Sequence, residues 1–234
     1  MSASRRLLPL LVAAAVAAFG AGGCALLSKS APIAPHYFSP ERPGDVPRLA
    51  PRLPGAPAEL RLGRVEGASH LEERLVYRDT ASEIGYYRLR RWTEAPEQYL
   101  KRRLARVLFE ERGLQRVVGG GGPTLEVQLT AFEEIRVPRR MARVQVIARL
   151  HDERIVRWEE TITVDLPVVA ARSGDTADAA VAAIGRALRA TVSRIANRVV
   201  RELAVADAPA VAPAVAPAMA PAFTPAASVS KRER

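Results

Sequence analysis

Four consecutive glycines, residues 119–122, could cradle a phosphate group, because glycine lets backbone N–H groups approach an anion closely. A phosphate-binding loop of that kind continues with Lys and Ser or Thr, and it opens a helix whose N-terminus faces the anion. Here Pro123 follows and leads into a segment that alternates like a strand. The sequence therefore predicts a flexible connection between strands and no nucleotide site.

Titratable side chains indicate no metal or acid–base site either. His36, His70 and His151 are scattered and lack the spacing of metal ligands. Glu133 and Glu134 could act as an acid and a base, but neighbouring strand residues point to opposite faces and no nucleophile accompanies them. We therefore expect no catalytic residue, no metal and no cofactor, and we interpret the glutamate pair as an exposed strand end.

The single cysteine, Cys24, is placed where covalent chemistry is expected. One cysteine forms neither an intramolecular disulfide nor a CxxC zinc or redox site. It follows Arg5 and Arg6, an uncharged run at residues 7–19, and small residues at 20–23. That run is shorter than the about 20 apolar residues that a helix needs to span a bilayer. The order predicts a signal peptide at residues 1–23.

The segment Ala21-Gly22-Gly23-Cys24 resembles the lipobox of bacterial lipoproteins, whose cysteine receives a diacylglycerol on sulfur before cleavage. A further acyl chain, such as palmitate, usually follows on the new amino terminus, and two or three chains anchor a protein stably. The resemblance implies a chain lipidated at Cys24, attached to the cell envelope and facing the periplasm. Ala25, in place of Asp, favours the outer membrane. The alternative is an ordinary secretory signal with a chance cysteine.

The charge balance is basic, with 35 Lys and Arg against 25 Asp and Glu. Loss of Arg5 and Arg6 with the leader lowers the net charge from +10 to +8. In a cytosolic protein this charge would favour nucleic-acid binding. Export argues against that partner, so we expect no nucleic acid. Two interpretations remain: attraction to anionic lipid headgroups, and a solvated surface rich in arginine.

Composition divides the mature chain into three parts. Residues 24–57 hold eight of the 18 prolines, which predicts an extended, semi-rigid spacer. Residues 58–204 carry the patterns of one folded domain of ordinary size. Residues 205–234 repeat Ala-Pro-Ala-Val and predict a disordered tail.

Within the domain, six segments alternate apolar and polar residues and predict strands. They are residues 59–66, 74–78, 83–89, 125–131, 142–150 and 156–164. The tetrad 151–154 is expected to join the last two as a hairpin, because neither segment is interrupted by Gly or Pro.

Two further segments carry apolar residues at helical spacing. The first begins near Pro96 and stops at Gly113, and the second is capped by Ser173 or Asp175. The second helix has its expected core positions at Ile184, Leu188, Val192, Ile195, Val199 and Leu203. Alternating strands bury one face. We therefore predict a two-layer α+β domain, with two amphipathic helices packed on one face of a mostly antiparallel or mixed sheet of five to six strands.

The densest aromatic and basic cluster contains Tyr86, Tyr87, Arg91 and Trp92. Aromatic and Arg side chains are typical anchors of protein interfaces, so these four residues are the candidate interface. Adjacent strand residues point to opposite faces, however, so at least one of the two tyrosines is expected in the core. Core packing and partner contact both remain open for the cluster, and Arg91 is the better candidate for contact.

An ordered series of short segments resembles the ABC-type transport auxiliary lipoprotein family, over about residues 24–203. In chain order the segments are 28–32, 37–41, 60–68, 70–71, 77–78, 83–87, 91–96, 108–110, 124–127 and 131–134. The most specific are Tyr86-Tyr87 and the following Arg91-Trp92. The resemblance implies a lipoprotein that works beside an ABC permease, its ATPase and an Mce-domain substrate-binding protein. It implies movement of lipids or other hydrophobic compounds, with no catalytic residue.

These observations favour a non-enzymatic, lipid-anchored accessory subunit of an envelope transport system. Bridging two membranes needs more than one small domain, so a homo-oligomer such as a ring is among the expectations. A different hypothesis is a free-standing periplasmic lipoprotein that binds a lipid or another ligand as a monomer. A third, an envelope hydrolase, lacks the Ser/His or carboxylate constellation that it requires.

Overall fold

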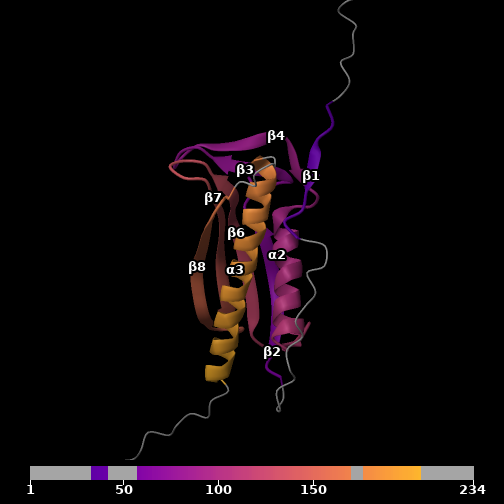
Figure 1. Ribbon diagram of the computed structural model, residues 1–234. Helices are drawn as coiled ribbons and strands as arrows, with labels where there is room; N and C mark the ends of the chain where they lie inside the picture. Colours follow the sequence, from indigo (N-terminus) through magenta and orange to yellow (C-terminus); the bar gives the residue numbers. More distant parts are fainter. Residues whose placement is uncertain (1–32, 42–56, 170–175, 207–234) are drawn as a thin grey trace, which may run out of the picture.

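The computed structural model describes residues 33–41, 57–169 and 176–206 (Figure 1). The predicted signal peptide, Cys24 and almost all of the predicted tail lie outside these residues. In order, the described elements are β1 His36–Phe38, β2 Glu59–Gly67, β3 Arg74–Arg78, β4 Ile84–Trp92, α2 Pro96–Ala105, the π-helix η2 Arg106–Glu111, β5 Gln115–Arg116, β6 Thr124–Ile135, β7 Met141–His151, β8 Val156–Pro167 and α3 Thr176–Ala206.

The longest pairings of the sheet run through β6. Strand β7 pairs with β6 antiparallel along its whole length, and β8 pairs with β7 in the same way. A strand has two edges, so β2 and β3 share the other edge of β6 and lie end to end along it. β2 pairs parallel with the first half of β6, and β3 pairs parallel with its last residues. The antiparallel hairpin β3–β4 then extends the sheet, with β1 parallel on β4.

The α+β class is confirmed, but the number of strands was wrong: within the described residues the sheet has eight strands, where five to six were predicted. The two additional strands are β1 and β5, of three and two residues. Segments this short show no readable alternation. Their backbone pairs with strands distant in sequence, since β1 joins β4 and β5 joins β2. β1 also lies inside residues 24–57, so part of the predicted spacer belongs to the sheet.

The alternation of β6 shifts once along the strand. Leu125, Val127 and Leu129 are buried. The register against β7 then shifts between Leu129 and Ala131, which indicates a β-bulge. After the bulge, Phe132 and Glu134 are the residues opposite the buried Val144 and Ala142 of β7. The bulge therefore places Glu134 on the side of the core.

The first predicted helix is present, and its C-terminal part is a π-helix. α2 begins with Pro96 at its first turn, where the missing N–H costs no hydrogen bond. Its buried face includes Leu100 and Leu104, and the chain continues without a break into the π-helix η2. Gly113 adopts a positive φ of 69°, as the predicted stop requires.

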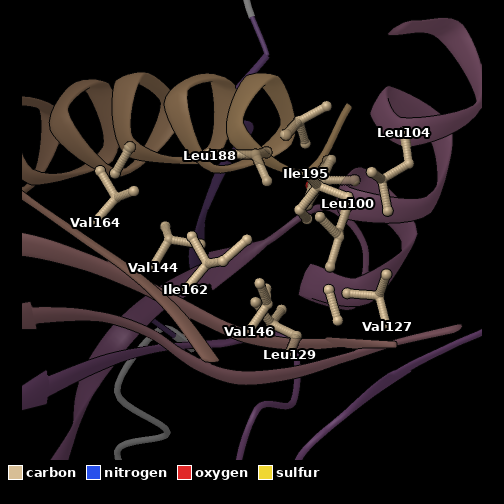
Figure 2. Packing of buried hydrophobic residues seen from close by; sticks show 14 of the residues in the cluster. Leu100, Leu104, Val127, Leu129, Val144, Val146, Ile162, Val164, Leu188 and Ile195 are labelled. Atoms are coloured by element: carbon tan, nitrogen blue, oxygen red, sulfur yellow. The ribbon is translucent and has the colours of Figure 1, made fainter. Parts of the chain in front are cut away.

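The second helix, α3, covers β7 and β8 while α2 lies beside it over β2 (Figure 1). All six predicted apolar positions of α3 are buried. Figure 2 shows Leu188 and Ile195 of α3 above Val144, Val146 and Ile162 of the sheet. Burial of each such side chain contributes about 1.5–3 kcal/mol. The two helices on one face of the sheet thus enclose the core.

The described chain enters the domain at β1. The carbonyl oxygen of Phe38 accepts a hydrogen bond from the backbone of Thr93, at 3.0 Å. Beyond β1, Pro40 is buried, and the carboxylate of Glu41 accepts a hydrogen bond from Arg102 at 2.9 Å. β1 lies at one end of the molecule, and the C-terminal end of α3 lies at the other (Figure 1).

Candidate interface site

The four candidate interface residues all lie on β4 or at its end, but they occupy different environments. Trp92 is fully buried. Its ring lies edge-on to Phe132, with 5.1 Å between ring centroids, and to Tyr99 at 6.3 Å. Edge-to-face aromatic contacts of this kind stabilise a core. Trp92 therefore packs inside the domain and holds β4 against β6 and α2.

Tyr87 lies in a partly buried network of aromatic and charged groups. Its hydroxyl donates a hydrogen bond to the carboxylate of Glu134, and its ring meets Tyr77 edge-on at 5.4 Å. The guanidinium of Arg136 lies 3.3 Å from the Tyr77 ring centroid and 5.0 Å from that of Tyr87. Burial, together with the hydrogen bond to Glu134, raises the pKa of the Tyr87 hydroxyl.

The interpretation of Glu133 and Glu134 as an exposed strand end was wrong, because their exposed fractions are 1% and 0%. Glu133 accepts two hydrogen bonds from Arg78 of β3, at 2.8 and 3.2 Å. Glu134 accepts one from Arg140, at 2.6 Å, in addition to that from Tyr87. The hairpin β3–β4 covers this end of β6, which a single strand's pattern does not reveal. Glu133 therefore fastens β3 to β6 through Arg78, and Glu134 fastens β4 to β6 through the Tyr87 hydroxyl.

Tyr86 is half-buried. The guanidinium of Arg74 lies 4.2 Å from its ring centroid, within the range of a cation–π contact. The Tyr86 hydroxyl approaches the carbonyl oxygen of His70 at 3.4 Å. Both contacts are within the domain, so at most one face of the Tyr86 ring is available for contact with a partner.

Arg91 is a partly exposed member of the candidate set, and Tyr37 lies beside it. In the parallel register of β1 and β4, Tyr37 lies opposite Arg91 and Phe38 opposite Trp92. Because Phe38 and Trp92 pack toward the core, alternation directs Tyr37 and Arg91 away from it. Tyr37 is 59% exposed. We call this pair the Tyr37–Arg91 surface.

Tyr37 was missed by sequence reasoning, because it lies in a proline-rich stretch that predicted only a spacer. The signal that could have found it is the aromatic pair Tyr37-Phe38 between Pro35 and Pro40, with one ring for each face of a strand. An exposed tyrosine beside an arginine is a combination suited to binding another macromolecule.

The glycine run at residues 119–122 connects β5 to β6, as predicted, and Pro123 accepts a backbone hydrogen bond from Arg61. The predicted hairpin joins β7 to β8, but His151, expected in its turn, is the last residue of β7 and pairs with Val156. Within the described residues, no three His, Cys, Asp or Glu side chains gather closely enough to hold a metal ion. In the same part of the chain, none of the helices combines the length and apolarity that crossing a bilayer demands.

Comparison with known proteins places the fold and the family. The crystal structure of a Xanthomonas campestris protein matches with a TM-score of 0.57 and 20% identity, over 67% of this chain and 93% of that one. A second crystal structure, of an uncharacterized protein, matches with a TM-score of 0.55 and 16% identity, over 71% of this chain and 99% of that one. At these identities the likeness shows a shared fold.

Comparison with curated proteins finds no match to this sequence. A family model, described as the ABC-type transport auxiliary lipoprotein component, matches residues 45–196. The match covers more than half of the chain and includes β2 to β8 and most of α3. The chain therefore belongs to the ABC-type transport auxiliary lipoprotein family.

Proposed function

We propose that this protein is a non-catalytic accessory subunit of an ABC/Mce-type system that moves lipids or other hydrophobic compounds across the cell envelope. The observation that carries the proposal is the family match over residues 45–196. The Tyr37–Arg91 surface supports it, because an accessory subunit acts by contact and needs a rigid, exposed recognition element. The Mce-domain protein and the permease with its ATPase are the proposed partners.

The proposed anchor is a lipid on Cys24, with the domain facing the periplasm and the outer membrane as its site. Eleven residues separate Cys24 from His36. A chain extends by at most about 3.6 Å per residue, so β1 would lie within about 40 Å of the lipid. On this proposal the β1 end of the domain is the end nearer the membrane, and the C-terminal end of α3 is the farther one (Figure 1).

The alternative, a free-standing lipid-binding lipoprotein, needs an apolar chamber for acyl chains. In the described residues, the space between the helices and the sheet is filled by packed side chains (Figure 2). A cavity between β8 and α3 is lined mainly by charged and polar residues. These observations favour the accessory subunit, which requires no chamber of its own. A homo-oligomer remains part of the proposal, since several copies would be needed to surround a hydrophobic path.

Affinity capture from native membranes tests the proposal. The tagged full-length protein should recover the Mce-domain protein together with the permease and ATPase. Arg91→Glu should reduce this recovery at least tenfold while the melting temperature stays unchanged. Arg154→Glu, at an exposed position beside the β7–β8 turn, is the matched control and should recover the partners normally. Equal recovery by the wild type and Arg91→Glu would exclude the Tyr37–Arg91 surface, and failure of the wild type to recover any partner would exclude the accessory role.

A further inference from the structure

A cavity of about 410 Å³ lies between the outer strand β8 and the C-terminal half of α3. This volume is within the range of small-molecule binding sites, roughly 300–1,000 Å³. The residues that line it are Glu160, Thr161, Ile162, Thr163, Arg194, Asn197, Arg198 and Arg201. The cavity is distant in sequence from the Tyr37–Arg91 surface, and it belongs to different elements.

The α3 side of the cavity is a stripe of nitrogen-bearing side chains. Arg194, Asn197, Arg198 and Arg201 are spaced i, i+3, i+4 and i+7, which places them on one face of the helix. The helical rise puts Arg194 and Arg201 about 10 Å apart along the axis. Three guanidinium groups therefore border one cavity.

Two of these groups are held in place by neighbours. Arg194 donates a hydrogen bond to the carbonyl oxygen of Thr163 on β8, at 3.2 Å. Arg198 forms an ion pair with Glu202 at 2.9 Å, and its guanidinium lies 5.7 Å from the Trp158 ring centroid. These contacts orient the arginines toward β8 and reduce the entropy that a bound ligand would otherwise cost.

The charge at the cavity is only partly neutralised within the domain. In residues 33–41, 57–169 and 176–206, neither Arg194 nor Arg201 forms an ion pair with a carboxylate. Glu160 is the one carboxylate among the lining residues, and its oxygen accepts a hydrogen bond from the Trp158 indole at 3.0 Å. Two arginines thus keep free charge beside a cavity that water or a ligand can enter.

We propose that this cavity binds a phosphate group, carried by a phospholipid headgroup or present as free phosphate. The planar fork of arginine matches phosphate oxygens bidentately. Arg194 and Arg201 supply two such forks from opposite ends of the cavity. A tetrahedral phosphate offers several oxygens to separate donors, which suits this arrangement better than a single planar carboxylate does.

Isothermal titration calorimetry on the full-length protein in non-ionic detergent tests the site. The probes are inorganic phosphate, short-chain phosphatidylglycerol below its micelle concentration, and short-chain diacylglycerol, which lacks the phosphate. The variants are the double change Arg194→Gln with Arg201→Gln, and Arg201→Gln alone. Arg201 is exposed and its side chain does not bind another helix or strand of the described chain, so Arg201→Gln should fold normally. The single variant therefore keeps the test valid if the double variant folds poorly. Arg88→Gln, on the exposed surface of β4, is the matched control.

We expect one or both phosphate-bearing probes to bind, diacylglycerol to fail, and Arg201→Gln to weaken binding about tenfold through the loss of charge-assisted hydrogen bonds. Binding of phosphatidylglycerol without inorganic phosphate identifies a headgroup as the source, and binding of both identifies the phosphate group itself. Three results would each overturn the proposal: no binding of either phosphate probe, unchanged binding by both cavity variants, or an equal loss in Arg88→Gln.

Discussion

A methyl group added to Gly185 would lie 2.3 Å from the carbonyl oxygen of Pro40. Gly185 is in the N-terminal third of α3, and Pro40 follows β1, so this contact joins the entry of the chain to the helix that covers the sheet. The approach is possible only because glycine has no Cβ. The atoms nearest to such a methyl group all belong to the backbone of Pro40, so no flexible side chain could move aside to relieve the clash.

Gly185→Ala should therefore destabilise the domain by about 1–3 kcal/mol, although alanine is the better helix former. The overpacking should separate residues 33–41 from α3 before the rest of the domain unfolds. Urea denaturation measures the first effect, and hydrogen exchange of the Phe38 and Thr93 amides measures the second. Ser193→Ala, on the exposed face of α3, should change stability by less than about 0.5 kcal/mol. Unchanged exchange in Gly185→Ala would show that the contact does not hold the N-terminal segment.

Glu134→Gln should destabilise the domain by about 3–5 kcal/mol, since it removes a fully buried carboxylate that accepts charge-assisted hydrogen bonds from Arg140 and a hydrogen bond from Tyr87. The comparison is Glu159→Gln, which removes the carboxylate paired with Arg149 where both side chains are 44–47% exposed. That variant should lose less than about 1 kcal/mol. Denaturant midpoints of the two variants at pH 7 check the difference. Similar losses in both would contradict a structural role for burial at Glu134.

Tyr87 should make stability depend on pH at the alkaline end. Its pKa is raised in the folded state by burial and by the hydrogen bond to Glu134. Below about pH 10, where a tyrosine in an unfolded chain begins to ionise, its contribution to stability is complete. As the pH rises further, the unfolded chain releases the proton first, so that contribution falls until the folded state also ionises. The melting temperature of the wild type should therefore fall more steeply above pH 10 than that of Tyr87→Phe, and parallel curves would refute this.

Trp92→Ala should cost about 3–5 kcal/mol of stability, because it empties a fully buried aromatic site between Phe132 and Tyr99. Arg91→Glu, one residue earlier, should leave the melting temperature nearly unchanged. Thermal denaturation of the two variants separates a core residue from a surface residue within one sequence motif. A stable Trp92→Ala variant would mean that the indole is not part of the core.

Periodicity in the sequence predicted the long elements well, because their burial is uniform along each element. The six apolar positions of α3 and the alternation of β7 depend only on which side faces the helix–sheet interior. The failures occur where pairing depends on distant residues. Tyr37 joins the sheet by pairing with β4, more than 50 positions later in the chain. Glu133 is buried because the β3–β4 hairpin pairs with β6, and the sequence of β6 alone does not reveal that pairing.

The candidate site shows the same division. Composition found the aromatic and basic cluster on β4, but separating buried Trp92 from surface Arg91 required the register with β1. The cavity between β8 and α3 could not be foreseen, since spacing along α3 reveals the stripe of arginines without revealing the strand that faces it.

The parallel pairing of β1 with β4 also has a mechanical consequence. A pulling force on the chain before β1, opposed at the C-terminal end of α3, would act along the strand direction of β1. The hydrogen bonds between His36–Phe38 and β4 would then be strained together, in shear, and would not break one after another. If those bonds parted, the tension would next reach the Pro40–Gly185 contact and the bridge from Glu41 to Arg102. We therefore expect the domain to stay folded when a pulling force acts on the segment that precedes β1.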